Sequence, residues 1–149
     1  MLTRQLRETL LRLYGEGDVD KAIAVNVLSF GFKHGLPQDA DLVFDVRFIP
    51  NPFYIPEMRP LTGADAPVHD YVMSFEETRV FLNKTLDLLK FLIPHYVSEG
   101  KDRLVIAVGC TGGQHRSVCL TNEIAKGLKA AGFHATASHR DTQIETKEK

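Results

Sequence analysis

The residues best suited to chemistry form one short segment, 109–117, with the sequence GCTGGQHRS. Gly112 and Gly113 let the backbone turn tightly, so that several N–H groups can converge on one point. Side-chain donors and the N–H groups of a following helix would surround the same point. The side chains that add such donors are Thr111, His115, Arg116 and Ser117. This pattern predicts a cradle for an anion, above all a phosphate group, over residues 110–117.

Two enzyme classes share parts of this pattern. A nucleoside-triphosphate P-loop needs G-x-x-x-x-G-K-[ST], and that string does not occur in the chain. A cysteine-dependent phosphatase places a thiolate at the floor of such a loop, and Cys110-x5-Arg116 has the right spacing. Asp45 or Asp65 would then have to supply the general acid. Binding is the favoured interpretation, and the phosphatase remains the alternative.

Further polar residues lie close to predicted strand ends and in a proline-rich segment. They are Lys33 and His34, Asp45 and Arg47, Asn51 and Arg59, and His139 and Arg140. Open α/β sheets gather ligands at the carboxyl ends of their strands, which makes these residues candidates for binding. Two alternatives stay open: Asp45 and Arg47 could be a structural ion pair, and Lys33 and His34 could lie in a solvated loop.

The elements that must position these residues alternate between strands and helices. Apolar alternation and apolar runs predict strands over residues 22–30, 42–48, 104–109 and 133–139. Helical spacing of apolar residues predicts helices over 2–14, from 75 to about 99, and over 117–131. The long helix should begin with a capping box, Ser74 to Glu77, and should end at Gly100.

A proline-rich connector, residues 49–67, separates the second strand from the long helix. It holds five of the seven prolines of the chain, which excludes a regular helix or a central strand. A rigid segment of this kind suits either a lid over a ligand or a packed loop, and Asn51 is its candidate ligand-binding residue. The strand–loop–helix over 104–131, followed by another strand, is a βαβ unit. The predicted fold is therefore a small, mainly parallel α/β sheet with flanking helices.

Composition bounds the possible functions. The chain has 149 residues and a net charge of −1, which fits one globular domain. That charge is uneven, because residues 39–102 carry 6 basic and 11 acidic groups whereas residues 103–140 carry 5 and 1. The sequence contains no run of about 18 apolar residues, so no membrane span is predicted. Cys110 and Cys119 lack metal-type spacing, which predicts no metal site and favours a reducing cytoplasm.

Several longer motifs add a resemblance to a known family. They are SFGFKHGLPQDAD (29–41), FDVRFIPNPF (44–53), RPLTG (59–63), VIAVGCTGGQHRSV (105–118) and SHRD (138–141). With these motifs the chain resembles the C-terminal domain of the RapZ (YvcJ-type) family of RNase adapter proteins. Residues 1–20 resemble the end of the helix between the family's two domains. Residues 21–141 resemble the binding domain, and residues 142–149 are expected to form a solvated tail.

The resemblance implies a regulatory binding module rather than an enzyme. Its ligand would be an amino-sugar phosphate such as glucosamine-6-phosphate, held by Thr111, Gly112, Gly113, Gln114, His115 and Arg116. Small regulatory RNA, presented to a ribonuclease, would lie on a basic face of Lys33, His34, Arg47, Arg59, Arg116, His139 and Arg140. The family also implies a homo-oligomer. ATP or GTP would bind an N-terminal domain whose Walker motif is absent here, so no cofactor is expected in this chain. Phe53 stands where well-studied members carry a histidine.

Overall fold

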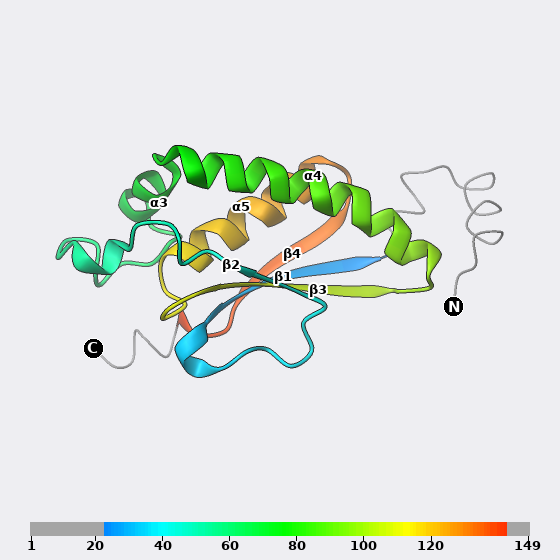
Figure 1. Ribbon diagram of the computed structural model, residues 1–149, viewed down its shortest axis with the longest axis horizontal. Coiled ribbons are helices and arrows are strands. Elements are labelled where there is room, and N and C mark those ends of the chain that lie inside the picture. The colour runs from blue at the N-terminus through cyan, green and yellow to red at the C-terminus, as the bar shows by residue number, and fades with distance from the viewer. Residues whose placement is uncertain (1–22, 143–149) are drawn as a thin grey trace.

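The computed structural model describes residues 23–142, so the predicted helix over 2–14 and the tail over 143–149 lie outside the described residues. Four strands form one sheet with the order β2-β3-β1-β4 (Figure 1). They are β1 (Ala24–Gly31), β2 (Leu42–Asp45), β3 (Arg103–Cys110) and β4 (His134–His139). All three strand pairs are parallel, which confirms the predicted parallel α/β fold.

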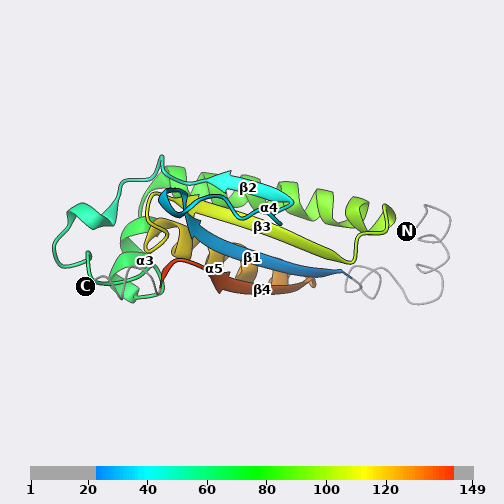
Figure 2. The ribbon, with the colours of Figure 1, turned by 90° about the horizontal axis from the view of Figure 1, so that it is seen from below.

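Three helices lie on one face of this sheet (Figures 1 and 2). They are α3 (Ala66–Met73), α4 (Glu76–Ser98) and α5 (Arg116–Ala130). Two short 3-10 turns, η1 (Phe32–His34) and η2 (Pro52–Tyr54), follow β1 and β2 along the chain. The long helix and the helix after the glycine segment are thus confirmed to within a residue at their starts. Gly100 follows α4 with a φ of 96°, as expected for a helix-ending glycine.

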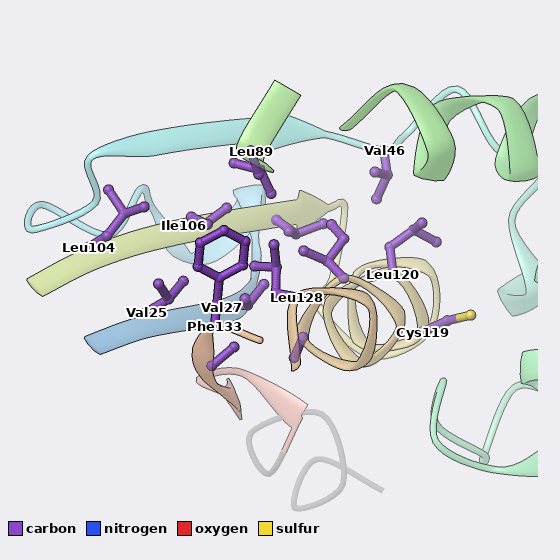
Figure 3. Close-up of a cluster of buried hydrophobic side chains, with 14 of the residues drawn as sticks. Val25, Val27, Val46, Leu89, Leu104, Ile106, Cys119, Leu120, Leu128 and Phe133 are labelled. Atoms are coloured by element: carbon purple, nitrogen blue, oxygen red, sulfur yellow. The ribbon is translucent and has the colours of Figure 1, made fainter. Parts of the chain in front are cut away.

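The hydrophobic core lies between the sheet and the helices (Figure 3). Leu104 and Ile106 of β3 and Val27 of β1 meet Leu120 and Leu128 of α5 in this layer. Every residue of β3 from Leu104 to Cys110 is buried, as its continuous apolar run predicted.

The sheet face opposite the helices is partly covered by aromatic rings near the ends of the strands. The rings of Phe30 and Phe32 lie 4.8 Å apart, in an edge-to-face arrangement, over Gly109. A Cβ atom at Gly109 would come within 2.6 Å of both rings. Gly109 is therefore required for this packing, which closes the second face of β3 beside the glycine segment.

Two predictions about element ends were wrong, and one helix was not predicted. Ser74 does not cap α4: its hydroxyl donates to Tyr71 O at 2.6 Å, and α4 has no side-chain N-cap. Helix α3 was missed because Pro67 was counted as part of a helix-free connector, yet proline is well suited to the first turn of a helix. Strand β2 ends at Asp45 rather than 48, because the Asp45 carboxylate accepts the backbone N–H of Arg47 and turns the chain.

Candidate functional site

The carboxyl ends of the parallel strands bring four segments to one edge of the sheet (Figure 1). β3 leads into the glycine loop, residues 110–117, and β1 leads into η1 beside it. The Lys33 N–H donates to Thr111 O at 3.2 Å, and the Arg140 N–H donates to Ser29 O at 3.0 Å. The expectation that these segments share an edge is therefore confirmed.

Two glycines allow the ends of β1 and β3 to approach closely. A Cβ atom at Gly31 would lie 2.4 Å from the carbonyl carbon of Gly112. Gly113 has a φ of 82°, and a Cβ atom there would lie 2.6 Å from Gly31 N. The Gly31 N–H donates to the buried carboxylate of Asp141 at 2.7 Å. Gly113 thus allows a close backbone contact with Gly31 that a side chain at position 113 would prevent.

The two cysteines differ in surroundings. The Cys110 thiol accepts the Gly113 N–H at 3.3 Å and donates to the Ser117 hydroxyl at 3.1 Å. Ser117 is therefore engaged with the thiol rather than turned toward a ligand. Cys119 lies deeper in α5, where burial, assisted by the negative charge of Glu123, raises the pKa of its thiol to about 12.

Three consecutive side chains of the glycine loop bind backbone carbonyls of the connector and of Arg47, two residues before it. Arg116 Nη1 donates to Arg47 O and Ile49 O, both at 2.9 Å. Gln114 Nε2 donates to Arg59 O at 2.8 Å and to Leu61 O at 2.6 Å. His115 Nε2 donates to Met58 O at 3.0 Å.

All three of these side chains are almost completely buried, with 4% exposure each. The side chains of the glycine loop thus fix five carbonyl groups, which lie on both sides of η2. The same side chains were expected to bind an anion directly. The interpretation of the connector as a segment packed on the loop is confirmed by these bonds.

A cavity of about 190 Å³ lies between the glycine loop and the connector. Its lining consists of Lys33, Asn51, Phe53, Tyr54, Cys110, Thr111, Gly112, Gln114, His115 and Arg116. The Nε of Arg116 is buried and has no hydrogen-bond partner within residues 23–142. Arg116 Nη2 donates to the Thr111 hydroxyl at 3.4 Å, and both residues line the cavity.

The basic residues predicted to form one face have different environments. Arg47 pairs with Asp45 at 2.7 Å and lies 4.0 Å above the Phe32 ring. Arg59 lies 4.8 Å from the centre of the Phe53 ring, and its Nε donates to Phe53 O at 2.9 Å. The Asp45–Arg47 pair confirms the alternative of an ion pair.

Two more of the predicted basic residues are partly committed to other groups. Arg140 pairs with the buried carboxylate of Asp141 at 2.9 Å. Burial lowers the pKa of His139, whose two ring nitrogens lie 2.7 Å from the Ser29 hydroxyl and 3.0 Å from Asn122 Oδ1. His139 is therefore mainly neutral at pH 7 and adds little positive charge to this edge.

Comparison with known proteins identifies the family. The RapZ C-terminal domain family matches residues 23–143. The chain belongs to this family. It is 55% identical over 139 residues to a nucleotide-binding protein of Clostridium perfringens, and it covers 47% of that relative. It is 54% identical over 144 residues to one of Clostridium acetobutylicum and 51% identical over 148 residues to one of Clostridium novyi.

The match covers almost the whole chain but only part of each relative. In these three comparisons 93%, 96% and 99% of the chain is aligned, whereas 47%, 49% and 50% of the relative is aligned. The chain thus spans about half the length of the relatives that it matches. It corresponds to the C-terminal part of the family, as the sequence motifs indicated.

In this member of the RapZ C-terminal domain family, the residues that line the cavity differ from the predicted site residues. Gly113 and Ser117 do not line it. Phe53 and Tyr54 do, and they were not predicted as site residues, although two exposed aromatic residues after Asn51-Pro52 were a usable signal. Arg116 is buried, so its assignment to an exposed RNA-binding face was wrong.

The geometry gives no support to the phosphatase alternative. The Arg116 guanidinium donates to connector carbonyls. Of the two candidate general acids, Asp45 is paired with Arg47, and Asp65 accepts the Thr62 N–H at 2.8 Å. Within residues 23–142 no three His, Cys, Asp or Glu side chains are grouped to hold a metal ion. In the same part of the chain, no helix has the length and apolar character that a membrane span needs.

Proposed function

We propose that this domain is a regulatory binding module with two ligands. A phosphorylated small molecule, of the amino-sugar phosphate class, occupies the cavity between the glycine loop and the connector. Small regulatory RNA binds along the basic residues at the same edge of the sheet, which serves the presentation of that RNA to a ribonuclease. The observation that carries the proposal is the wall of the cavity, where Lys33 and Arg116 lie together with Thr111 and Gly112 of the glycine loop.

The cavity fits a small anion with an apolar part. Its volume of about 190 Å³ is below the ~300–1,000 Å³ of sites for drug-sized ligands, so it suits one small metabolite. Lys33 and Arg116 supply positive charge to its wall, and Thr111 supplies a hydroxyl. Phe53 and Tyr54 form the apolar side, against which the carbon skeleton of a sugar can pack. Phosphate and sugar would therefore meet different walls of one cavity.

The basic residues at this edge of the sheet support the RNA half of the proposal. Three of the strands are followed by such residues: Lys33 and His34 after β1, Arg47 after β2 and Arg140 after β4. The connector adds Arg59. Arginine and lysine at one edge can contact successive phosphates without reading the sequence of the bases. Affinity for RNA should then fall steeply as salt rises from 50 to 200 mM.

The metabolite half is tested by titration calorimetry with three probes: glucosamine-6-phosphate, glucosamine and inorganic phosphate. We expect the sugar phosphate to bind most tightly and glucosamine to show no heat of binding. A ligand at 100 times its Kd should also raise the free energy of unfolding by about 2.7 kcal/mol. Equal binding of glucosamine and its phosphate would contradict the phosphate site.

A matched pair of variants locates the ligand. Thr111→Val removes a hydroxyl from the wall of the cavity, whereas Thr136→Val removes an exposed hydroxyl in the middle of β4. We expect Thr111→Val to weaken sugar-phosphate binding severalfold and Thr136→Val to leave it unchanged. Equal effects of the two substitutions would place the ligand elsewhere.

A further inference from the structure

Two exposed aromatic side chains of η2, Phe53 and Tyr54, project beside the cavity. Tyr54 is 76% exposed and Phe53 is 44% exposed, although an aromatic ring gains free energy from burial. Their ring centres are 5.8 Å apart and their planes meet at 83°, so the edge of one ring meets the face of the other at a corner, and the Tyr54 ring has the more exposed surface. A small ligand inside the cavity can contact only part of these two rings, which leaves ring surface for a second group.

The backbone holds this corner in a fixed position. Asn51 Oδ1 accepts the Phe53 N–H at 3.0 Å, and the Ile55 N–H donates to Pro52 O at 2.9 Å. On either side of η2, Gln114 and Arg116 bind the carbonyls of the connector. Rings that are held in place in advance lose little conformational entropy when a partner stacks on them.

Positive charge surrounds the same corner. The Arg59 guanidinium lies 4.8 Å from the centre of the Phe53 ring, and Lys33 lines the cavity that both rings line. Of the two acidic residues of the connector, Glu57 lies between the aromatic pair and Arg59 in the sequence, and Asp65 lies after Arg59. Flat ring faces beside cations favour a flat partner that carries negative charge. An unpaired nucleotide combines both properties, whereas the bases of a duplex are already stacked on one another.

We propose that Phe53 and Tyr54 form a stacking platform for an unpaired base of RNA, with Arg59 and Lys33 directed to the neighbouring phosphates. This inference rests on the RNA half of the proposed function and names the kind of RNA segment bound: single-stranded rather than duplex. The platform adds an attraction that salt does not screen to the salt-dependent contacts of the basic residues.

The test measures fluorescence anisotropy of labelled 12-nucleotide RNA with the full chain. The probes are single-stranded oligouridylate, a duplex of the same length and an oligonucleotide of abasic sugar-phosphate. We expect Tyr54→Ala to weaken oligouridylate binding by roughly 5- to 100-fold with an unchanged salt slope. Tyr54→Phe should retain wild-type affinity, because it keeps the ring. Phe91→Ala, which removes an exposed ring from α4, should have no effect.

Four results would overturn the platform, and they have three different meanings. The platform would be refuted, with RNA binding intact, if the wild type and Tyr54→Ala bound oligouridylate with equal affinity. The same would follow if the wild type bound the abasic probe as tightly as oligouridylate. A change in oligomeric mass by light scattering in Tyr54→Ala, without a change in RNA affinity, would assign the rings to contacts between copies. Failure of the wild type to bind any RNA would overturn the RNA half of the proposed function as well, while the calorimetry would still judge the metabolite half.

Discussion

The glycine loop and the connector face each other across the cavity, and they differ in where their side chains point. In the loop, Gln114, His115 and Arg116 are buried and bind carbonyl groups of the connector. In the connector, Phe53 and Tyr54 are exposed while the backbone around them is fixed. The polar motif therefore acts largely as a structural clamp, and the less polar segment supplies the rings beside the cavity.

This difference shows why a motif of typical ligand-binding residues does not identify ligand contacts by itself. Arg116 has the residue type and the spacing for an anion site, yet Nη1 is already engaged by two carbonyls. What remains for a ligand is Nη2, which donates to the Thr111 hydroxyl at 3.4 Å, together with that hydroxyl and the backbone at Gly112. The three predictions below test how the connector, the glycine loop and the helix behind it are held in place, in order of decreasing effect at pH 7.

The largest effect is expected for Arg116→Ala. This substitution leaves the carbonyls of Arg47 and Ile49 without their buried donor and should lower the free energy of unfolding by about 3 kcal/mol, measured by urea denaturation. Release of the connector should also speed chymotrypsin cleavage after Phe53 or Tyr54. The control Arg103→Ala removes an exposed arginine from the start of β3 and should change stability by less than about 0.5 kcal/mol. Equal stability of the two variants would mean that Arg116 is not a clamp.

A smaller effect is expected for Gly113→Ala. The positive φ and the close approach to Gly31 should together lower stability by about 2 kcal/mol. Gly132 also has a positive φ, of 96°, but open space surrounds its Cα, so Gly132→Ala should cost about 1 kcal/mol. The two melting transitions measure the difference, which reports the contact between β1 and the glycine loop. A Gly113→Ala variant as stable as Gly132→Ala would show that the two segments can separate without cost.

The third effect appears only at alkaline pH and concerns Cys119, behind the glycine loop. Its folded pKa of about 12 lies above the ~8.5 of an unfolded cysteine, so the folded state retains a proton that the unfolded state releases. Its stabilising contribution is complete below pH 8.5 and falls by about 1.4 kcal/mol per pH unit between the two pKa values. Cys119→Ala should flatten this fall in chemical denaturation at pH 8 to 11. An unchanged slope would show that this thiol ionises as readily in the folded protein.

The sequence predicted most of the fold because the signals were local and periodic. The apolar run of β3, the alternation in β1 and the stripe of α4 each indicate one element, and the parallel order follows from connections between them. The predicted cap at Ser74 was wrong because its hydroxyl donates to Tyr71 O at the end of α3, and no side chain caps the start of α4.

The candidate site was predicted less completely, for a physical reason. The glycine loop is continuous in sequence, and its place at the end of a buried strand followed from the pattern. Its partners, such as Met58 O and Leu61 O, are backbone atoms more than fifty residues away. Every residue has a backbone carbonyl group, so residue type does not indicate which carbonyls accept these bonds. Sequence reasoning could therefore name Arg116 as functional but could not tell that it is buried.

The central claim is that the cavity between the glycine loop and the connector holds a phosphorylated small molecule. The most direct test is a titration of the ¹⁵N-labelled chain with glucosamine-6-phosphate, followed by amide chemical shifts. We expect saturable shifts at Thr111, Gly112 and Lys33, with smaller shifts at Phe53 and none at the amino end of β3. Saturable shifts that avoid the glycine loop, or the absence of any shift at millimolar ligand, would contradict the account.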